Sequence, residues 1–158
     1  MTTAATDPYL LETSTEVDAS PREVWEVVSD LRRMPEWSPQ TRKMLIRGPI
    51  GVGTRSLNLN KLGWRVWPTT SVVVRYEPQR AIAFKVPING TVWSYELEDL
   101  GDGRTRLAER REAPQGTSAV SRELIKRFLG GDEAFSAQLE RDMARTLARI
   151  KGVVERSV

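Results

Sequence analysis

The stretch Ala19-Ser20-Pro21-Arg22-Glu23-Val24-Trp25 marks the beginning of a helix and decides how the rest of the chain is interpreted. Ser20 stands at the N-cap position, Pro21 suits the first helical position, and Glu23 completes a capping box with Ser20. The apolar residues that follow recur at helical spacing, namely Val24, Trp25, Val28 and Leu31. This pattern predicts a helix from about residue 21 to residue 31.

The segments on either side of this helix predict a strand before it and a sharp change of direction after it. Residues 9–17 alternate in places and carry β-branched Thr and Val, which favours a first strand. The segment Met34-Pro35-Glu36-Trp37-Ser38-Pro39 follows the helix. Its two prolines lack a backbone donor and restrict the residues before them. We therefore expect a short second helical turn or a tight elbow there.

From about residue 41 to residue 113 the pattern changes to strands separated by turns. Asn89-Gly90 and Asp102-Gly103 are the strongest hairpin signals, because both central residues of a type I′ turn need a positive φ. The intervening segments predict strands at residues 69–77, 81–86, 91–100 and 105–113. Their connections are too short for parallel crossovers, so the pattern predicts an antiparallel meander.

The C-terminal part returns to helical periodicity. One apolar stripe runs over residues 120–128, Gly130-Gly131 interrupts it, and Asp132 can cap a second segment. In that segment apolar residues recur every three or four positions, namely Phe135, Leu139, Met143, Leu147, Ile150 and Val154. The order of elements predicts an α+β fold. A curved antiparallel sheet of about seven strands would be covered on one face by a long C-terminal helix.

Composition limits the classes of function. The chain has 158 residues, of which 39% are hydrophobic and 28% charged, as expected for one globular domain. We place that domain at residues 9–156, after a flexible N-terminus at residues 1–8. The chain contains no His and no Cys. This excludes an imidazole base, a thiol nucleophile and the usual zinc and haem ligands, so we expect no metal and no cofactor.

Hydropathy and charge bear on location and partners. No apolar run approaches the roughly 20 residues needed to cross a bilayer. The first residues lack the features of a secretion signal, so we expect a cytoplasmic protein without a transmembrane segment. The formal net charge is +3, with Asp and Glu interleaved among the Arg residues. A dispersed excess this small gives little reason to expect nucleic-acid or membrane binding.

The chain resembles the START-related (SRPBCC) superfamily, which includes polyketide cyclases/dehydrases, lipid-transfer domains and plant hormone receptors. The resemblance spans about residues 9–156. It is carried by the capping segment quoted above, Met34-Pro35-Glu36-Trp37, Gly51-Val52-Gly53-Thr54, Tyr76-Glu77-Pro78 and the terminal helix. It implies a helix-grip fold with two short helices after the first strand. It also implies an apolar ligand held between the concave sheet and the C-terminal helix.

A set of aromatic and aliphatic residues is the candidate lining of that pocket. Alternation places Trp93, Tyr95 and Leu97 on one face of their strand, and Phe84 on one face of the strand before it. Any of these side chains could instead belong to the hydrophobic core. The candidate ligand-binding residues are Trp37, Phe84, Trp93, Tyr95, Leu97, Leu107, Phe128, Phe135, Leu139 and Met143.

Three polar residues are candidates for chemistry in the pocket. If Leu107 faces inward, alternation sends Glu109 and Arg111 inward too, where they could hold a ligand oxygen or act as an acid/base pair. The alternative is a structural ion pair or a solvated one. A phenol at Tyr95 could donate a hydrogen bond to a ligand carbonyl. The catalytic candidates are therefore Tyr95, Glu109 and Arg111.

Two functions remain open from the sequence. The first is binding of a hydrophobic small molecule, such as a lipid, a fatty acid or a polyketide. The second is a cyclase, aromatase or dehydrase that acts on a polyketide in the same cavity. The absence of His and Cys favours binding. The protein is expected to be a monomer or a homodimer.

Overall fold

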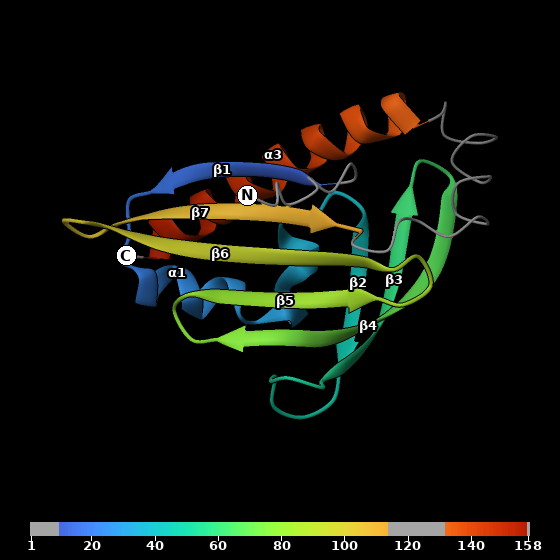
Figure 1. Ribbon diagram of the computed structural model, residues 1–158, viewed down its shortest axis with the longest axis horizontal. Helices are drawn as coiled ribbons and strands as arrows, with labels where there is room; N and C mark the ends of the chain where they lie inside the picture. The colour runs from blue at the N-terminus through green and yellow to red at the C-terminus, as the bar shows by residue number, and fades with distance from the viewer. Residues whose placement is uncertain (1–9, 114–131, 158) are drawn as a thin grey trace, which may run out of the picture.

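The computed structural model describes residues 10–113 and 132–157. Figure 1 shows a curved sheet with a long helix lying across one side of it. The elements follow the expected order: β1 (Leu11–Val17), α1 (Pro21–Val28), η1 (Leu31–Glu36), β2 (Thr41–Ile46), β3 (Arg55–Leu62), β4 (Arg65–Glu77), β5 (Ala81–Val86), β6 (Thr91–Gly101), β7 (Arg104–Glu112) and α3 (Asp132–Ser157). The expected flexible N-terminus, the stripe at residues 120–128 and Gly130-Gly131 lie outside the described residues.

The first helix begins as predicted and ends earlier than predicted. The Ser20 Oγ accepts from the Glu23 backbone N–H at 3.3 Å, and the Glu23 carboxylate accepts from the Ser20 N–H at 2.8 Å. The helix stops at Val28 because Asp30 leaves the helical conformation, with φ −87° and ψ 84°. The chain then forms a 3-10 helix, η1, which contains Pro35 and in which Leu31 is buried. The expected short second helical turn is thus confirmed.

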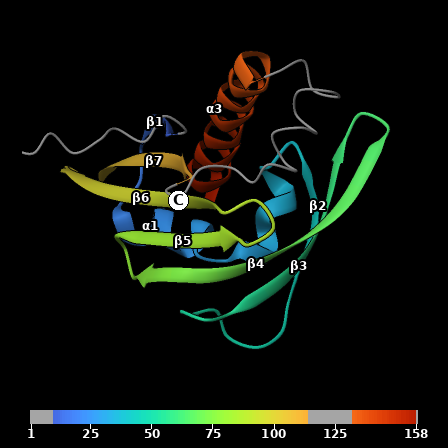
Figure 2. The same cartoon turned by 45° about the vertical axis from the view of Figure 1, so that its right-hand side comes forward.

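The strands form one seven-stranded antiparallel sheet in the order β1-β7-β6-β5-β4-β3-β2. The β6–β7 hairpin turns at Asp102 and Gly103, both at positive φ (54° and 73°), as its type I′ signal requires. Figure 2 shows the β3–β4 hairpin curving away from the helices. This fold is the predicted helix-grip α+β arrangement. Among the described residues no helix is both long and apolar enough to cross a membrane.

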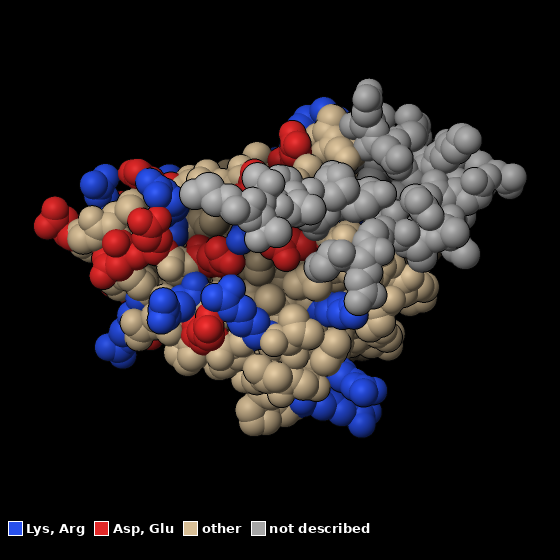
Figure 3. Space-filling model, viewed as in Figure 1, with Lys and Arg blue, Asp and Glu red and all other residues tan. Residues whose placement is uncertain are grey.

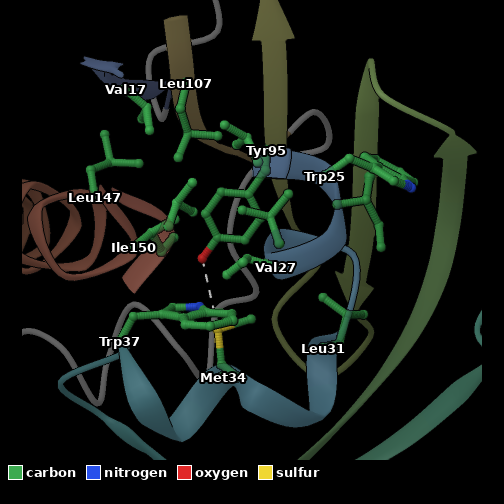
Figure 4. Packing of buried hydrophobic residues seen from close by; sticks show 14 of the residues in the cluster. Val17, Trp25, Val27, Leu31, Met34, Trp37, Tyr95, Leu107, Leu147 and Ile150 are labelled. Carbon is green, nitrogen blue, oxygen red and sulfur yellow. Dashed lines mark hydrogen bonds between the residues drawn. The ribbon is translucent and has the colours of Figure 1, made fainter. Parts of the chain in front are cut away.

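The hydrophobic core occupies one end of the space between the sheet and the helices. Figure 4 shows the side chains that meet there, from β1, α1, η1, β6, β7 and α3: Val17, Trp25, Val27, Leu31, Met34, Trp37, Tyr95, Leu107, Leu147 and Ile150. Of the α3 side chains that the structure describes, only those in the C-terminal half of the helix enter this cluster. Strand β3 and the described preceding turns of α3 contribute no described residue to the cluster, and β2 and β4 contribute only Met44 and Val73 to its buried set, so these elements are left to surround an adjoining space.

Candidate functional site

A pocket of about 570 Å³ lies between the sheet and the first half of α3. Its apolar wall comes from paired strands and from one face of the helix. Phe84 on β5 lies opposite Trp93 on β6, and both line the pocket. Leu139 and Met143, one turn apart on α3, close it from the other side. Four of the predicted ligand-binding residues are thus brought together around one space.

A buried carboxyl group forms the first polar point of the pocket. Glu109 on β7 lies directly opposite Tyr95 on β6, and the side chains of both line the pocket. The Tyr95 hydroxyl lies 3.5 Å from Glu109 Oε1 and 3.7 Å from the Met34 sulfur, so its single proton can serve either acceptor. Figure 4 shows this hydroxyl directed at Met34, beside the Trp37 ring. The other oxygen of this carboxyl group, Glu109 Oε2, is buried and has no hydrogen-bond partner among the described residues.

Burial sets the protonation of this pair. Glu109 is only 5% exposed, and desolvation of its charged form raises its pKa to about 8, although the Tyr95 hydrogen bond opposes the shift. The pKa of Tyr95 is raised well above its usual value, first by burial and then by the nearby Glu109 charge. A carboxyl group with a pKa near 8 holds its proton through most of the neutral range. The site therefore contains a neutral acid that can donate to a ligand oxygen.

Arg111 is the second polar group on this side. It lies two residues after Glu109 on β7, on the same face of the strand and opposite Trp93. Its guanidinium carbon is 5.9 Å from the centre of the Trp93 ring. Arg111 is buried and lines the pocket. The predicted inward direction of Leu107, Glu109 and Arg111 is therefore observed, because all three are buried.

A second polar wall, on β3 and β4, was not predicted from the sequence. Asn58 and Asn60 are buried and line the pocket. Each donates a hydrogen bond to the Thr69 hydroxyl, at 3.3 and 3.0 Å. The Ser56 hydroxyl donates to the side-chain oxygen Oδ1 of Asn58 at 2.7 Å and shares a short hydrogen bond with the Ser71 hydroxyl. The sequence of β3 does alternate strictly between polar residues and Leu57 and Leu59, which indicates a strand with one polar face. The usual assumption that leucine faces inward would assign the wrong face of this strand to the pocket.

A third polar group approaches from the helix. Asp142 on α3 is buried and accepts hydrogen bonds from Gln40 at 3.0 Å and from Gln138 at 2.9 Å. Asp142 and Gln40 both line the pocket. The Thr146 hydroxyl donates to the Asp142 backbone carbonyl, one turn earlier on the helix. The pocket thus has oxygen and amide groups on its sheet and helix walls, with aromatic and aliphatic side chains between them.

Three of the predicted ligand-binding residues that the structure describes do not join this lining. Trp37, at the end of η1, and Leu107 are fully buried in the core, and Leu97 packs against that core. The two leucines miss the pocket because the inward face of a strand serves the core at one end and the pocket at the other. Phe128 and the side chain of Phe135 lie outside the described residues. Among the described residues no group of three or more Asp or Glu side chains is arranged to hold a metal ion.

Comparisons with known proteins agree with this arrangement. The family described as polyketide cyclase / dehydrase and lipid transport matches residues 10–155. The polyketide cyclase-like protein Cgl2372 of Corynebacterium glutamicum is 28% identical, with 92% of this chain and 91% of that chain covered and a TM-score of 0.57. No curated protein matches the chain.

Two further solved structures share the fold. The Zhui aromatase/cyclase of Streptomyces sp. R1128 is 23% identical over 93% of both chains, with a TM-score of 0.74. The di-domain aromatase/cyclase StfQ of the steffimycin biosynthetic pathway is 14% identical, with a TM-score of 0.75 over 94% of this chain and 51% of that one. At these identities the likeness establishes the fold.

Proposed function

The chain belongs to the polyketide cyclase/dehydrase and lipid transport family, and from this premise we propose that it binds a hydrophobic small molecule in the pocket between the sheet and α3. The pocket supports this proposal, since its volume of about 570 Å³ lies within the range of small-molecule sites. Its walls combine aromatic rings with a few convergent polar groups, which is the usual composition of such a site.

The polar walls favour a ligand that carries oxygen atoms along its length. Glu109 and Tyr95 offer donors from β6 and β7, whereas Asn58 and Asn60 offer amides from β3. Both N–H groups of Asn60 already donate, to the Trp67 carbonyl and to Thr69, but a plain fatty acyl chain would give no partner to Glu109 or to the second N–H group of Asn58. A polyketide-like molecule, with carbonyl or hydroxyl groups at intervals, would use them. The observation that carries the proposal is this pairing of an apolar wall with polar groups on three strands, β3, β6 and β7.

A comparison of the affinities of two probes tests the ligand class. Purified protein would be titrated with palmitate and with 1,8-dihydroxyanthraquinone, and bound ligand would be followed by native mass spectrometry and by quenching of Trp fluorescence. We expect the oxygenated aromatic probe to bind at least about tenfold more tightly, and replacement of Asn58 by Leu to remove that preference. Preference for palmitate would contradict the proposed class. Failure of both probes to bind would contradict the pocket as a ligand site.

A second candidate function, dehydration of a bound β-hydroxy ketone, is favoured by the protonated state of Glu109. Its carboxyl group would give a proton to the departing hydroxyl, which leaves as water. The carboxylate so formed would take a proton from the carbon next to the carbonyl, which completes the double bond and restores the acid. One group can do both steps when its pKa lies near the working pH, as the pKa of Glu109 does.

Glu109→Gln separates the two functions, because the amide keeps the shape of the side chain and loses the transferable proton. If the protein dehydrates its ligand, turnover should fall by about two or more orders of magnitude, with binding reduced much less. If the protein only binds, affinity alone should change. An unaltered rate in Glu109→Gln would contradict a role for this carboxyl group in chemistry.

A further inference from the structure

On strand β3 the polar side chains face inward and the apolar side chains face outward. Its asparagines face the pocket, whereas Leu57 and Leu59 are 51% and 39% exposed on the outer face of the sheet. Leu45 on β2 and Val66 on β4 add to this outer face, at 59% and 56% exposed. The lining of the pocket accounts for the buried asparagines, but it does not account for the exposed leucines. Single exposed apolar residues need no explanation, but a group of them marks an interaction surface.

The strand register makes these residues neighbours. Leu45 lies opposite Leu57, and Leu59 lies opposite Pro68. Val66 lies opposite Lys61, and Lys43 lies opposite Leu59. Residues directly opposite each other on adjacent strands have side chains on the same face and in contact range. We call this set the outer leucine face: Leu45, Leu57, Leu59, Val66 and Pro68, with the cations Lys43, Arg55 and Lys61 among them.

The charge around the outer leucine face has one sign. Residues 37–76 contain no Asp or Glu, but they contain seven basic residues: Arg42, Lys43, Arg47, Arg55, Lys61, Arg65 and Arg75. Of these, Arg75 forms ion pairs with Glu77 and Glu96, so it does not add to the charge of this surface. Because the chain as a whole carries only +3, the remainder is net negative. In Figure 3 the carboxylates lie among basic groups over the left and the centre of the view, while the lower right, where β3 and β4 lie, shows basic groups without them. The dispersed charge expected from the sequence is therefore wrong for this part of the chain.

An exposed tryptophan extends this surface to the pocket. Trp64, in the turn between β3 and β4, is 86% exposed, and the Arg65 guanidinium carbon lies 5.4 Å from the centre of its ring. Trp64, Arg65 and Leu62 also line the pocket. The same hairpin therefore carries the outer leucine face on one side and part of the pocket wall on the other.

We propose that the outer leucine face, with Trp64 at its end, docks the protein on an anionic lipid bilayer. Aliphatic side chains between Lys and Arg, next to an exposed Trp, match a membrane interface, where the apolar groups enter the headgroup layer and the cations meet lipid phosphates. A second copy of the chain is disfavoured, because it would bring two surfaces of positive charge together. Nucleic acid is disfavoured, because phosphate contacts use the cations and leave the leucines exposed.

The surface and the pocket contents are separate properties. Docking requires only the outer leucine face and Trp64, whereas the proposed function requires the groups inside the pocket. The hairpin that bears Trp64 would bring the pocket wall close to the lipid phase, which suits exchange of a hydrophobic ligand between bilayer and protein. A failure to bind ligand would therefore leave the docking proposal standing, and a failure to dock would leave ligand binding standing.

Flotation with lipid vesicles tests the proposal. The full chain would be mixed with vesicles of phosphatidylcholine alone or with 30 mol% phosphatidylglycerol, as a chosen condition of about physiological anionic content. We expect binding only to the anionic vesicles, weakened by 0.5 M salt, which is roughly three times physiological strength. Since each cation near such a surface contributes about fivefold, Lys43→Glu/Lys61→Glu should weaken partition by at least about 25-fold.

Matched variants separate the surface from general charge. Arg22→Glu/Arg106→Glu makes the same change of net charge at exposed positions on α1 and β7, away from the outer leucine face, and should bind nearly as the wild type does. Leu57→Ser/Leu59→Ser should weaken partition by at least about tenfold. These leucines are exposed, so the variant is expected to keep its circular dichroism spectrum and its thermal midpoint.

Trp64 supplies a direct readout of insertion. Its emission should shift to the blue and be quenched by brominated lipid when anionic vesicles are added, and Trp64→Phe should abolish both changes. Absence of wild-type binding to anionic vesicles at low salt would overturn the proposal. The proposal would also be overturned if Lys43→Glu/Lys61→Glu and Leu57→Ser/Leu59→Ser both bound vesicles as the wild type does. The same holds if only Arg22→Glu/Arg106→Glu lost binding. Selective binding to an acidic protein in place of vesicles would also overturn it.

Discussion

Replacement of Glu109 by Gln should change how the stability of the protein depends on pH. In the folded protein burial holds the Glu109 pKa at about 8, whereas in the unfolded chain it returns to its ordinary value of 4.5. Below pH 4.5 both states carry the proton, so the group adds no pH dependence. Between pH 4.5 and about pH 8 only the unfolded state loses it, so the free energy of unfolding falls as pH rises.

The size of this effect follows from the width of that window. Each pKa unit corresponds to 1.36 kcal/mol, so a shift from 4.5 to about 8 destabilises the wild type by about 5 kcal/mol once the pH exceeds 8. Between pH 5 and pH 8 the loss is about 3 to 4 kcal/mol. Gln cannot ionise, so its contribution stays constant. At pH 5, where Glu109 is protonated when folded, the two proteins should agree within about 2 kcal/mol.

Urea unfolding followed by Trp fluorescence measures the effect. The wild type and Glu109→Gln would be unfolded at intervals from pH 5 to pH 9, and the free energy in water taken at constant m-value. The difference between the two proteins should move in favour of Glu109→Gln by about 3 to 4 kcal/mol from pH 5 to pH 8. Two other carboxylates do not disturb this window: ion pairing lowers the pKa values of Glu36 and Glu155, so their stabilisation is constant above about pH 4.5 and is lost only as the pH falls below it.

Glu98→Gln is the matched control, since it makes the same chemical change on the neighbouring strand β6 at a side chain that is 62% exposed. It should keep the wild-type profile. A difference between the wild type and Glu109→Gln that stays constant within about 1 kcal/mol from pH 5 to pH 8 would refute the reasoning, because it would mean that Glu109 ionises as easily when folded as when unfolded.

Three smaller predictions follow from single contacts. Tyr95→Phe removes the hydroxyl whose hydrogen bond lowers the pKa of Glu109, so that pKa should rise further. ¹³C NMR of the labelled Glu109 carboxyl group would measure it, and a lower pKa in the variant would contradict the contact. Leu107→Ala should cost about 2 to 5 kcal/mol in urea unfolding, because Leu107 lies fully buried in the core, while ligand affinity changes little. Ser20→Ala should cost about 1 kcal/mol through loss of the capping box, and Ser20→Asp should recover most of it.

Much of the fold was predictable because its signals are local. The capping box at Ser20 and the turn at Asp102-Gly103 act within a few residues, and both are seen as predicted. The end of α1 was missed because nothing within that segment forbids three more helical residues. The chain leaves the helix at Asp30 to bury Leu31 in a core that η1, the sheet and α3 build together.

The site was predictable along each strand and less so between strands. Alternation on β7 correctly turned Glu109 and Arg111 inward once Leu107 was taken as buried. The same reasoning gave no way to know that Leu107 would serve the core and Glu109 the pocket, two residues apart. On β3 the rule that leucine faces inward failed, since Asn58 faces the pocket and Leu57 the outside.

The sequence by itself determined the order of elements, the turns and the alternation that gives every strand two faces, because these depend on backbone preferences and on neighbours along the chain. Only the tertiary structure decided which face of β3 lines the pocket and that Tyr95 stands opposite Glu109. It also decided that the Glu109 carboxyl group holds its proton at neutral pH. Register and burial depth depend on everything packed around a group, so they become defined only when the whole sheet and its helices are in place.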